Sequence, residues 1–151
     1  MATITLDQAS AIIDAALAKG AEVGAAPLTV AVLDPGGHLV AHKRQDGSGI
    51  LRTDVATGKA WGALGIGASS RIIAGMAEQR PHLVGAFAAL AGGRFVPAAG
   101  GVLIRAKDGE LVGAVGISGD VSDVDEDCAV AGVEAVGLAA DLDVPGYMAK
   151  R

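Results

Sequence analysis

The chain has 151 residues and a formal net charge of −5, with 51% hydrophobic residues and 23 glycines but only 3% aromatic residues. The acidic balance disfavours nucleic acid and anionic membranes as partners, and a single cysteine excludes an intramolecular disulfide or a thiolate metal cluster. The length predicts one domain. The domain must build its core from small aliphatic residues, which leaves apolar surface exposed. We expect this surface to be covered in a homo-oligomer, a dimer or larger.

The N-terminal segment predicts a helix and shows no targeting signal. Thr5 and Gln8 have the spacing of a capping box, and an apolar stripe follows on one helix face until Gly20 and Gly24. The segment lacks the basic stretch and cleavable apolar core of a signal peptide, and no apolar run reaches the length of a membrane span. We therefore expect a cytoplasmic location and no membrane contact.

A first hairpin is predicted after this helix. The apolar run Leu28–Leu33 is typical of a buried strand, and the four residues Asp34-Pro35-Gly36-Gly37 are a strong turn signal. The chain then returns through Leu39–Arg44. The two runs should pair antiparallel.

The middle of the chain is predicted to be mainly helical. Helices are expected over Thr53–Leu64, Arg71–Gln79 and Leu83–Leu90, although several glycines weaken them. A short edge strand is predicted at Arg94–Val96, because the proline that follows is better tolerated at a sheet edge than in its centre.

A second hairpin is the most informative part of the chain. Its strands are predicted at Val102–Ile104 and Leu111–Val112, and the dipeptide Asp108-Gly109 between them is typical of a tight reversal. Glycines then recur at every third position, which predicts a loop that the backbone of another element, or a ligand, approaches closely. These glycines are Gly113, Gly116 and Gly119.

A final helix is predicted from Asp123 to Leu142. Ser122 would open it, with Asp125 three residues later as an imperfect capping box. Cys128 lies among small residues of this helix, where an inert core thiol is the expected role.

This order of elements predicts an α+β fold with a single antiparallel sheet of about five strands flanked by helices, because it leaves no space in the sequence for repeated β-α-β units. We expect residues 1–144 to form the domain and residues 145–151 to form a C-terminal tail.

Lys59 is a candidate ligand-binding or catalytic residue. Its predicted helix places it on one stripe with Val55, Ala56 and Ala63, where a lysine is unusual. A partly desolvated amine binds a carboxylate or serves as a base or Schiff-base nucleophile, whereas the structural alternative is an amine that reaches solvent or pairs with an acid.

Arg44 and Asp46 are candidates for an anion clamp and its orienting carboxylate, because both follow the second strand. Solvated loop charges are the alternative. Ser118, Gly119 and Asp125 are further ligand-binding candidates, since backbone N–H groups at a helix N-terminus bind small anions. For the glycine-spaced segment itself, sheet packing is the alternative.

His42 is the candidate haem ligand. It shares a strand face with Arg44, which would meet a propionate, and a single imidazole suffices as one axial ligand. The other two histidines, His38 and His82, lack metal-ligand spacing, so we predict no separate metal site.

Three segments together resemble a known family: LTVAVLDPGGHLVAHKRQDGSG, ATGKAWGA and GGVLIRAKDGELVGAVGISGDVSDVDEDCAVAG. Their most specific motifs are L-D-x-G-G at Leu33–Gly37, R-x-D-G at Arg44–Gly47, K-A at Lys59-Ala60, and G-x-x-G-x-S-G before Asp125-Glu126. They are similar to GlcG/HbpS-type proteins and to the C-terminal domain of PduO-type cobalamin adenosyltransferases. The resemblance implies a flanked antiparallel sheet, symmetric oligomers and, in several relatives, haem binding.

The function expected is small-molecule binding, with haem or a related tetrapyrrole as the named ligand. The alternatives are a cofactor-independent enzyme acting on an anionic, carboxylate-bearing substrate through Lys59 and Glu126, and a structural or partner-binding oligomer subunit. The pocket is predicted where the end of the second strand, the helix carrying Lys59 and the segment Gly116–Asp120 converge.

Overall fold

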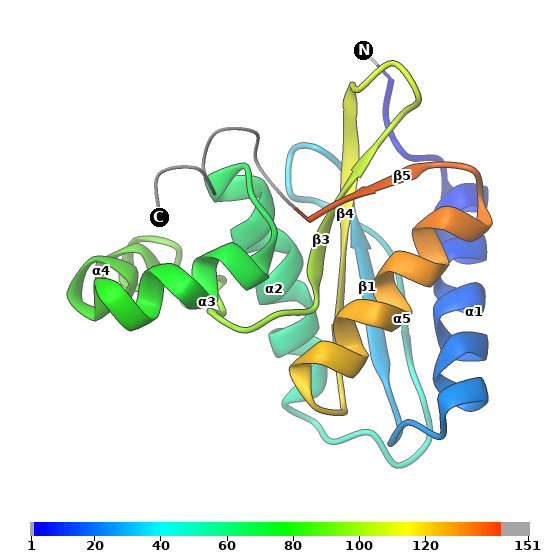
Figure 1. Cartoon of the computed structure of the whole chain (residues 1–151), viewed down its shortest axis with the longest axis horizontal. Coiled ribbons are helices and arrows are strands. Elements are labelled where there is room, and N and C mark those ends of the chain that lie inside the picture. The colour runs from blue at the N-terminus through cyan, green and yellow to red at the C-terminus, as the bar shows by residue number, and fades with distance from the viewer. Residues whose placement is uncertain (1, 143–151) are drawn as a thin grey trace.

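The computed structural model describes residues 2–142 and places five strands in one antiparallel sheet (Figure 1). The strand order is β2-β1-β4-β3-β5. The strands are β1 (Thr29–Leu33), β2 (Leu39–Arg44), β3 (Gly101–Arg105), β4 (Leu111–Ser118) and β5 (Ala139–Asp141). The predicted α+β class and the two predicted hairpins are confirmed.

Helices cover both faces of the sheet (Figure 1). One face carries α1 (Leu6–Val23) and α5 (Ser122–Ala135), and the other carries α2 (Arg52–Ile66). The two remaining helices, α3 (Ser70–Gln79) and α4 (Pro81–Leu90), continue from α2 and extend away from the sheet. Within residues 2–142, no helix combines the length and the hydropathy needed to cross a membrane.

Helix α1 forms as its sequence predicts. Thr5 is the N-cap, and its side chain and that of Gln8 make the reciprocal hydrogen bonds of a capping box. Gly24 ends the helix in the left-handed region, with φ 70°. Close packing on α5 is possible because Gly132 has no side chain: a Cβ there would lie 2.6 Å from the Ile12 carbonyl oxygen.

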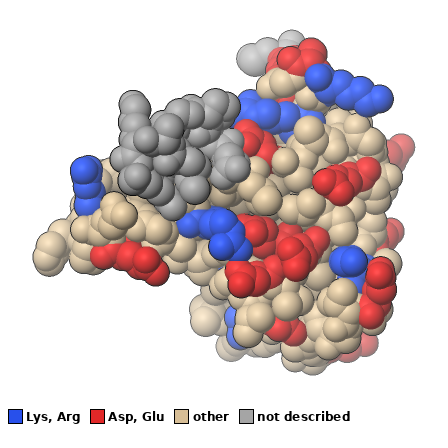
Figure 2. Space-filling view, viewed as in Figure 1, with Lys and Arg blue, Asp and Glu red and all other residues tan. Residues whose placement is uncertain are grey.

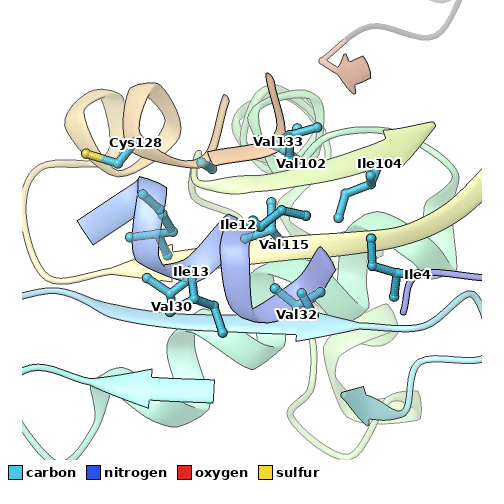
Figure 3. Close-up of a cluster of buried hydrophobic side chains, with 14 of the residues drawn as sticks. Ile4, Ile12, Ile13, Val30, Val32, Val102, Ile104, Val115, Cys128 and Val133 are labelled. Carbon is cyan, nitrogen blue, oxygen red and sulfur yellow. The ribbon is translucent and has the colours of Figure 1, made fainter. Parts of the chain in front are cut away.

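The main core lies between this helix pair and the sheet. Figure 3 shows Ile12 and Ile13 of α1 over Val30, Val32 and the other strands. Cys128 is fully buried in this cluster, and burial raises the pKa of its thiol, which agrees with the predicted inert core thiol.

On the other face of the sheet, the backbone of α2 packs directly against the backbone of β3 and β4. A Cβ on Gly116 of β4 would overlap the carbonyl oxygen of Ala56 in α2, and a Cβ on Gly101 of β3 would overlap that of Lys59. Alanines of α2 fill the remaining space against the sheet. Small residues therefore set how closely α2 lies on the strands.

The predicted glycine loop is wrong in its placement, since Gly113 and Gly116 lie within β4, which continues to Ser118. Their spacing does reflect close approach of another chain segment. Gly116 meets α2, and a Cβ on Gly113 would lie 2.5 Å from the Leu33 carbonyl oxygen. The packing alternative therefore explains both glycines.

Two further predictions are wrong. Residues Arg94–Val96 form no strand, because Phe95 turns into an apolar cluster with α2 and α4 instead of pairing. The last helix ends at Ala135 instead of Leu142; Gly137, with φ 77°, turns the chain, and β5 becomes the edge strand on β3. The predicted tail, residues 145–151, lies outside the described residues.

Candidate functional site

One row of polar residues crosses three neighbouring strands, β2, β1 and β4. Thr29 of β1 pairs with Arg44 of β2 on one side and with Ser118 of β4 on the other. Thr29 and Ser118 are fully buried although each carries a hydroxyl. Buried hydroxyls need hydrogen-bond partners, and these come from the segment that leads into α2.

Three side-chain hydrogen bonds satisfy this row. The hydroxyls of Thr29 and Ser48 lie 2.7 Å apart, and Arg44 Nη1 donates to the Ser48 carbonyl oxygen at 2.7 Å. Arg52 Nη1 donates to Ser118 Oγ at 3.0 Å. We call Thr29, Arg44, Ser48, Arg52 and Ser118 the basic corner.

The charges of the basic corner are not balanced locally. Both guanidinium groups bond to neutral oxygens, and among residues 2–142 neither Arg44 nor Arg52 forms an ion pair. Other cations of the chain do, as Lys43 with Asp14 and Arg105 with Asp141 show. Arg52 is also the first residue of α2, where the helix dipole is positive. The corner is therefore suited to an anion.

His42 lies two residues before Arg44 on the same strand, so both side chains point to the face that carries α2. It is half-buried, and its Nε2 lies 3.1 Å from the hydroxyl of Thr53, the second residue of α2. Apolar side chains are exposed close by in the sequence: Leu39 on the same strand is 57% exposed, and Ile50 and Leu51, just before α2, are 92% and 65% exposed.

Lys59 is buried and paired. Its Nζ donates to the Ile117 carbonyl oxygen at 2.9 Å and to Asp125 Oδ2 at 3.1 Å, and the two side chains are 3% and 1% exposed. Burial lowers the pKa of Lys59, which the charge of Arg52 lowers further, while Asp125 opposes both effects. Burial likewise raises the pKa of Asp125.

Asp125 serves the turn before α5 and not the predicted capping box. The N-cap of α5 is Val121, which has no side-chain cap, and Asp125 Oδ1 accepts from the Asp120 N–H at 3.0 Å. Asp120 in turn accepts from the Ala26 N–H, a bond that lowers the pKa of Asp120. Gly119 packs against Pro27 and Leu28. The prediction of Ser122 as a capping residue is therefore wrong.

Asp46 and Glu126 do not pair with the candidate site residues Arg44 and Lys59. Arg44 bonds to Ser48 and makes no ion pair with Asp46, which is exposed. Glu126 pairs with Arg71 of α3, whose Nε lies 2.9 Å from Oε1, and not with Lys59. Arg71 also binds the exposed Asp123, and Figure 2 shows acidic atoms gathered over α5 beside a basic group. Burial raises the pKa of Glu126, against the effect of Arg71.

The structure thus brings together some of the predicted site residues. Arg44 and Ser118 lie on either side of Thr29 in the basic corner, and His42 is on the same strand as Arg44. Lys59 binds Asp125 and the carbonyl oxygen of Ile117, the residue before Ser118. Sequence reasoning missed Thr29, Ser48 and Arg52. The available signal was a polar residue at the end of each apolar strand, with an arginine opening the next helix.

Comparison with protein families gives one match: the model described as haem degrading protein HbpS-like matches residues 4–134. No curated protein matches the chain. Several solved structures have a similar fold. The PduOC–haem complex is 22% identical with TM-score 0.82, covering 92% of this chain and 99% of that chain.

Protein ORFY of Klebsiella pneumoniae is 25% identical with TM-score 0.81, covering 91% of this chain and 92% of that chain. A double mutant of Streptomyces reticuli HbpS is 29% identical with TM-score 0.75, covering 89% of this chain and 87% of that chain. The sheet and helices described above are therefore shared with proteins of this kind.

Proposed function

This chain belongs to the HbpS-like family, and from that membership we propose that it binds haem or a related tetrapyrrole at the basic corner. The observation that carries the proposal is the pair Arg44 and Arg52, two arginines without carboxylate partners among residues 2–142, next to the half-buried His42. A family of small-molecule and haem binders and a similar fold in the PduOC–haem complex support it.

The residues present suit the parts of such a ligand. Haem carries two propionates, and each arginine offers the forked donor geometry that carboxylates prefer. The buried hydroxyls of Thr29 and Ser118 are already satisfied and need no partner from the ligand. Ser118 accepts from Arg52, and Thr29 bonds to the hydroxyl of Ser48, whose carbonyl oxygen accepts from Arg44. Exposed Ile50 and Leu51 would contact the apolar macrocycle.

His42 would ligate the iron. The Thr53 hydroxyl holds the imidazole in one orientation, which is the usual role of a second residue behind a metal ligand. Haem would supply redox and oxygen chemistry when bound, whereas His42 would hold the iron and Arg44 and Arg52 would hold the propionates.

A haem titration tests this proposal. We expect a Soret band with wild type, loss or a shift of the band in His42→Ala, and weaker binding in Arg44→Gln and Arg52→Gln. His82→Ala and Arg80→Gln are matched controls, because both residues are exposed on or before α4. An unchanged spectrum and affinity in His42→Ala would remove His42 as the ligand, and unchanged affinity in both arginine variants would remove the basic corner as the site.

A second candidate is a cofactor-independent enzyme that acts on a carboxylate-bearing substrate through Lys59. The observation that favours it is the 3.1 Å contact of Lys59 Nζ with Asp125 Oδ2, because this carboxylate is placed to take the proton of an amine whose pKa burial lowers. Incubation with pyruvate followed by borohydride should then attach a reduced adduct to Lys59, detected by mass spectrometry of the peptide. Labelling elsewhere, or none, would reject this candidate.

We also propose a homo-oligomer, supported by exposed apolar residues on several elements, among them Leu6, Leu39 and Leu90. Light scattering at micromolar concentration should give at least a dimer, and a monomer would contradict it.

A further inference from the structure

Three of the four aromatic side chains of this protein, those within residues 2–142, gather at one place. The chain has one tryptophan, two phenylalanines and one tyrosine, and Trp61, Phe87 and Phe95 line a single hollow of about 400 Å³ between α2 and α4. Its other lining residues are Gly65, Ile66, Leu90 and Ala91. We call this the aromatic pocket. Its volume lies in the lower part of the range of small-molecule sites.

The walls of the aromatic pocket are fixed by packing. The rings of Phe87 and Phe95 meet edge to face, with centroids 5.9 Å apart. Phe95 is buried against α2 at Gly62, where a Cβ would lie only 3.1 Å from the ring. Gly65, also on α2, is exposed and leaves the floor of the hollow open beside Trp61. The hollow therefore exists without rearrangement of these side chains.

One cation stands at this pocket. The Arg94 guanidinium lies 4.3 Å from the centroid of the Trp61 ring, and its Nε donates to the Ala91 carbonyl oxygen at 2.8 Å. Among residues 2–142 it forms no ion pair with a carboxylate. The pocket thus combines an apolar, aromatic interior with one positive charge beside Trp61 that no acid of the described chain neutralises.

We propose that the aromatic pocket is a second ligand site, for a small arylalkyl monocarboxylate. The aryl group would lie among Phe87, Phe95 and Ile66, and the carboxylate would accept hydrogen bonds from Arg94. The site is separate from the basic corner, because Trp61 follows Arg52 by nine residues of α2, roughly 13 Å along the helix axis. Ligand binding in the aromatic pocket does not require haem at the basic corner.

Trp61 makes the test direct because it is the only tryptophan. The probe is 4-phenylbutyrate, followed by Trp61 fluorescence, with the neutral 4-phenylbutyramide as its matched control. We expect the carboxylate to bind more tightly than the amide to the wild type. Arg94→Gln should weaken the carboxylate roughly tenfold and leave the amide unchanged, since a charge-assisted hydrogen bond is lost, and Arg94→Lys should restore part of the difference.

Two further variants distinguish binding in the aromatic pocket from binding at the basic corner. Gly65→Leu fills the floor and should abolish binding of both probes, whereas His42→Ala should change neither titration. Equal affinity of the carboxylate and the amide, or an Arg94→Gln variant that binds like wild type, would overturn the proposal. The proposal would also be overturned if a second copy of the chain filled the aromatic pocket. In that case the wild type would not bind the probe, and Leu90→Glu would dissociate the oligomer.

Discussion

The Lys59 ammonium lies 3.1 Å from the Asp125 carboxylate, and almost no solvent reaches either side chain. This ion pair joins α2 to the start of α5 across the end of β4, because Lys59 also binds the Ile117 carbonyl oxygen and Asp125 the Asp120 N–H. It fixes the chain segment that contains Ser118, and through Ser118 it positions Arg52.

Removing either Lys59 or Asp125 should lower the unfolding free energy, and the two losses should depend on pH in opposite ways. Lys59→Met and Asp125→Asn should each cost about 3–5 kcal/mol of unfolding free energy near neutral pH, because a buried group loses its partner. Burial raises the pKa of Asp125 above its ordinary 3.8, and without Lys59 the pKa rises further. The stability of Lys59→Met is therefore greatest below pH 3.8 and falls as pH rises through the folded-state pKa.

The reverse holds for Asp125→Asn, since burial lowers the pKa of Lys59 below its ordinary 10.5. Its stability is greatest above pH 10.5 and falls as pH decreases through the folded-state pKa. Urea unfolding at pH 5, 7 and 9 measures how the unfolding free energy of each single variant changes with pH. The double variant Lys59→Met/Asp125→Leu removes both charges and should show neither pH dependence. Parallel slopes for the two single variants would contradict a buried ion pair.

The close contact of Gly116 with α2 predicts that adding a single methyl group at this position lowers the unfolding free energy strongly. A Cβ there would overlap the Ala56 carbonyl oxygen, which is backbone and cannot rotate away, so Gly116→Ala should lose about 3 kcal/mol of unfolding free energy. The matched control is Gly85→Ala in α4, where a Cβ meets nothing within 4 Å. That variant should gain about 0.5–1 kcal/mol from helix propensity. Similar effects of the two substitutions would show that α2 does not lie this close to β4.

The capping box of α1 predicts a smaller effect. Thr5→Ala removes the acceptor for the Gln8 N–H and should lower the unfolding free energy by about 1 kcal/mol. Thr5→Ser keeps the hydroxyl and should behave like wild type in thermal unfolding. A loss in Thr5→Ser as large as in Thr5→Ala would point to the methyl group, and not to the cap.

Arg71 should stabilise the protein through Glu126 more than through Asp123. Arg71→Gln leaves the carboxylate of Glu126, 8% exposed, without its cation, and should cost about 1–3 kcal/mol. Asp123 is 78% exposed, so Asp123→Asn should change the unfolding free energy by less than about 0.5 kcal/mol. Chemical denaturation of both variants at pH 7 decides between the two partners.

Much of the fold follows from local signals in the sequence. The capping box at Thr5, the turn at Asp34–Gly37 and the turn at Asp108-Gly109 each act within a few residues, and the elements they bound are present. The predicted end of the last helix is wrong because Ala139–Asp141 pairs with β3, a partner distant in the sequence. A tertiary contact of that kind outweighs helix propensity.

The candidate site is harder to predict for the same reason. Arg44 and Ser118 can be identified from their own surroundings, but their joint position depends on Thr29, which pairs with both. Arg52 reaches Ser118 across 66 residues of sequence. Likewise, the sequence offers two adjacent acids, Asp125 and Glu126, as partners for Lys59. Only the packing of α5 decides that Asp125 faces Lys59.

Cys128 and Trp61 are each the single residue of their type, and they lie on opposite faces of the sheet. Thiol labelling at Cys128 therefore reports when the layer of α1 and α5 opens, while Trp61 fluorescence reports the layer of α2 and α4. Labelling that keeps pace with the fluorescence change in urea would mean that both layers unfold as one cooperative unit. The natural sequence thus supplies a probe for each half of the molecule without any substitution.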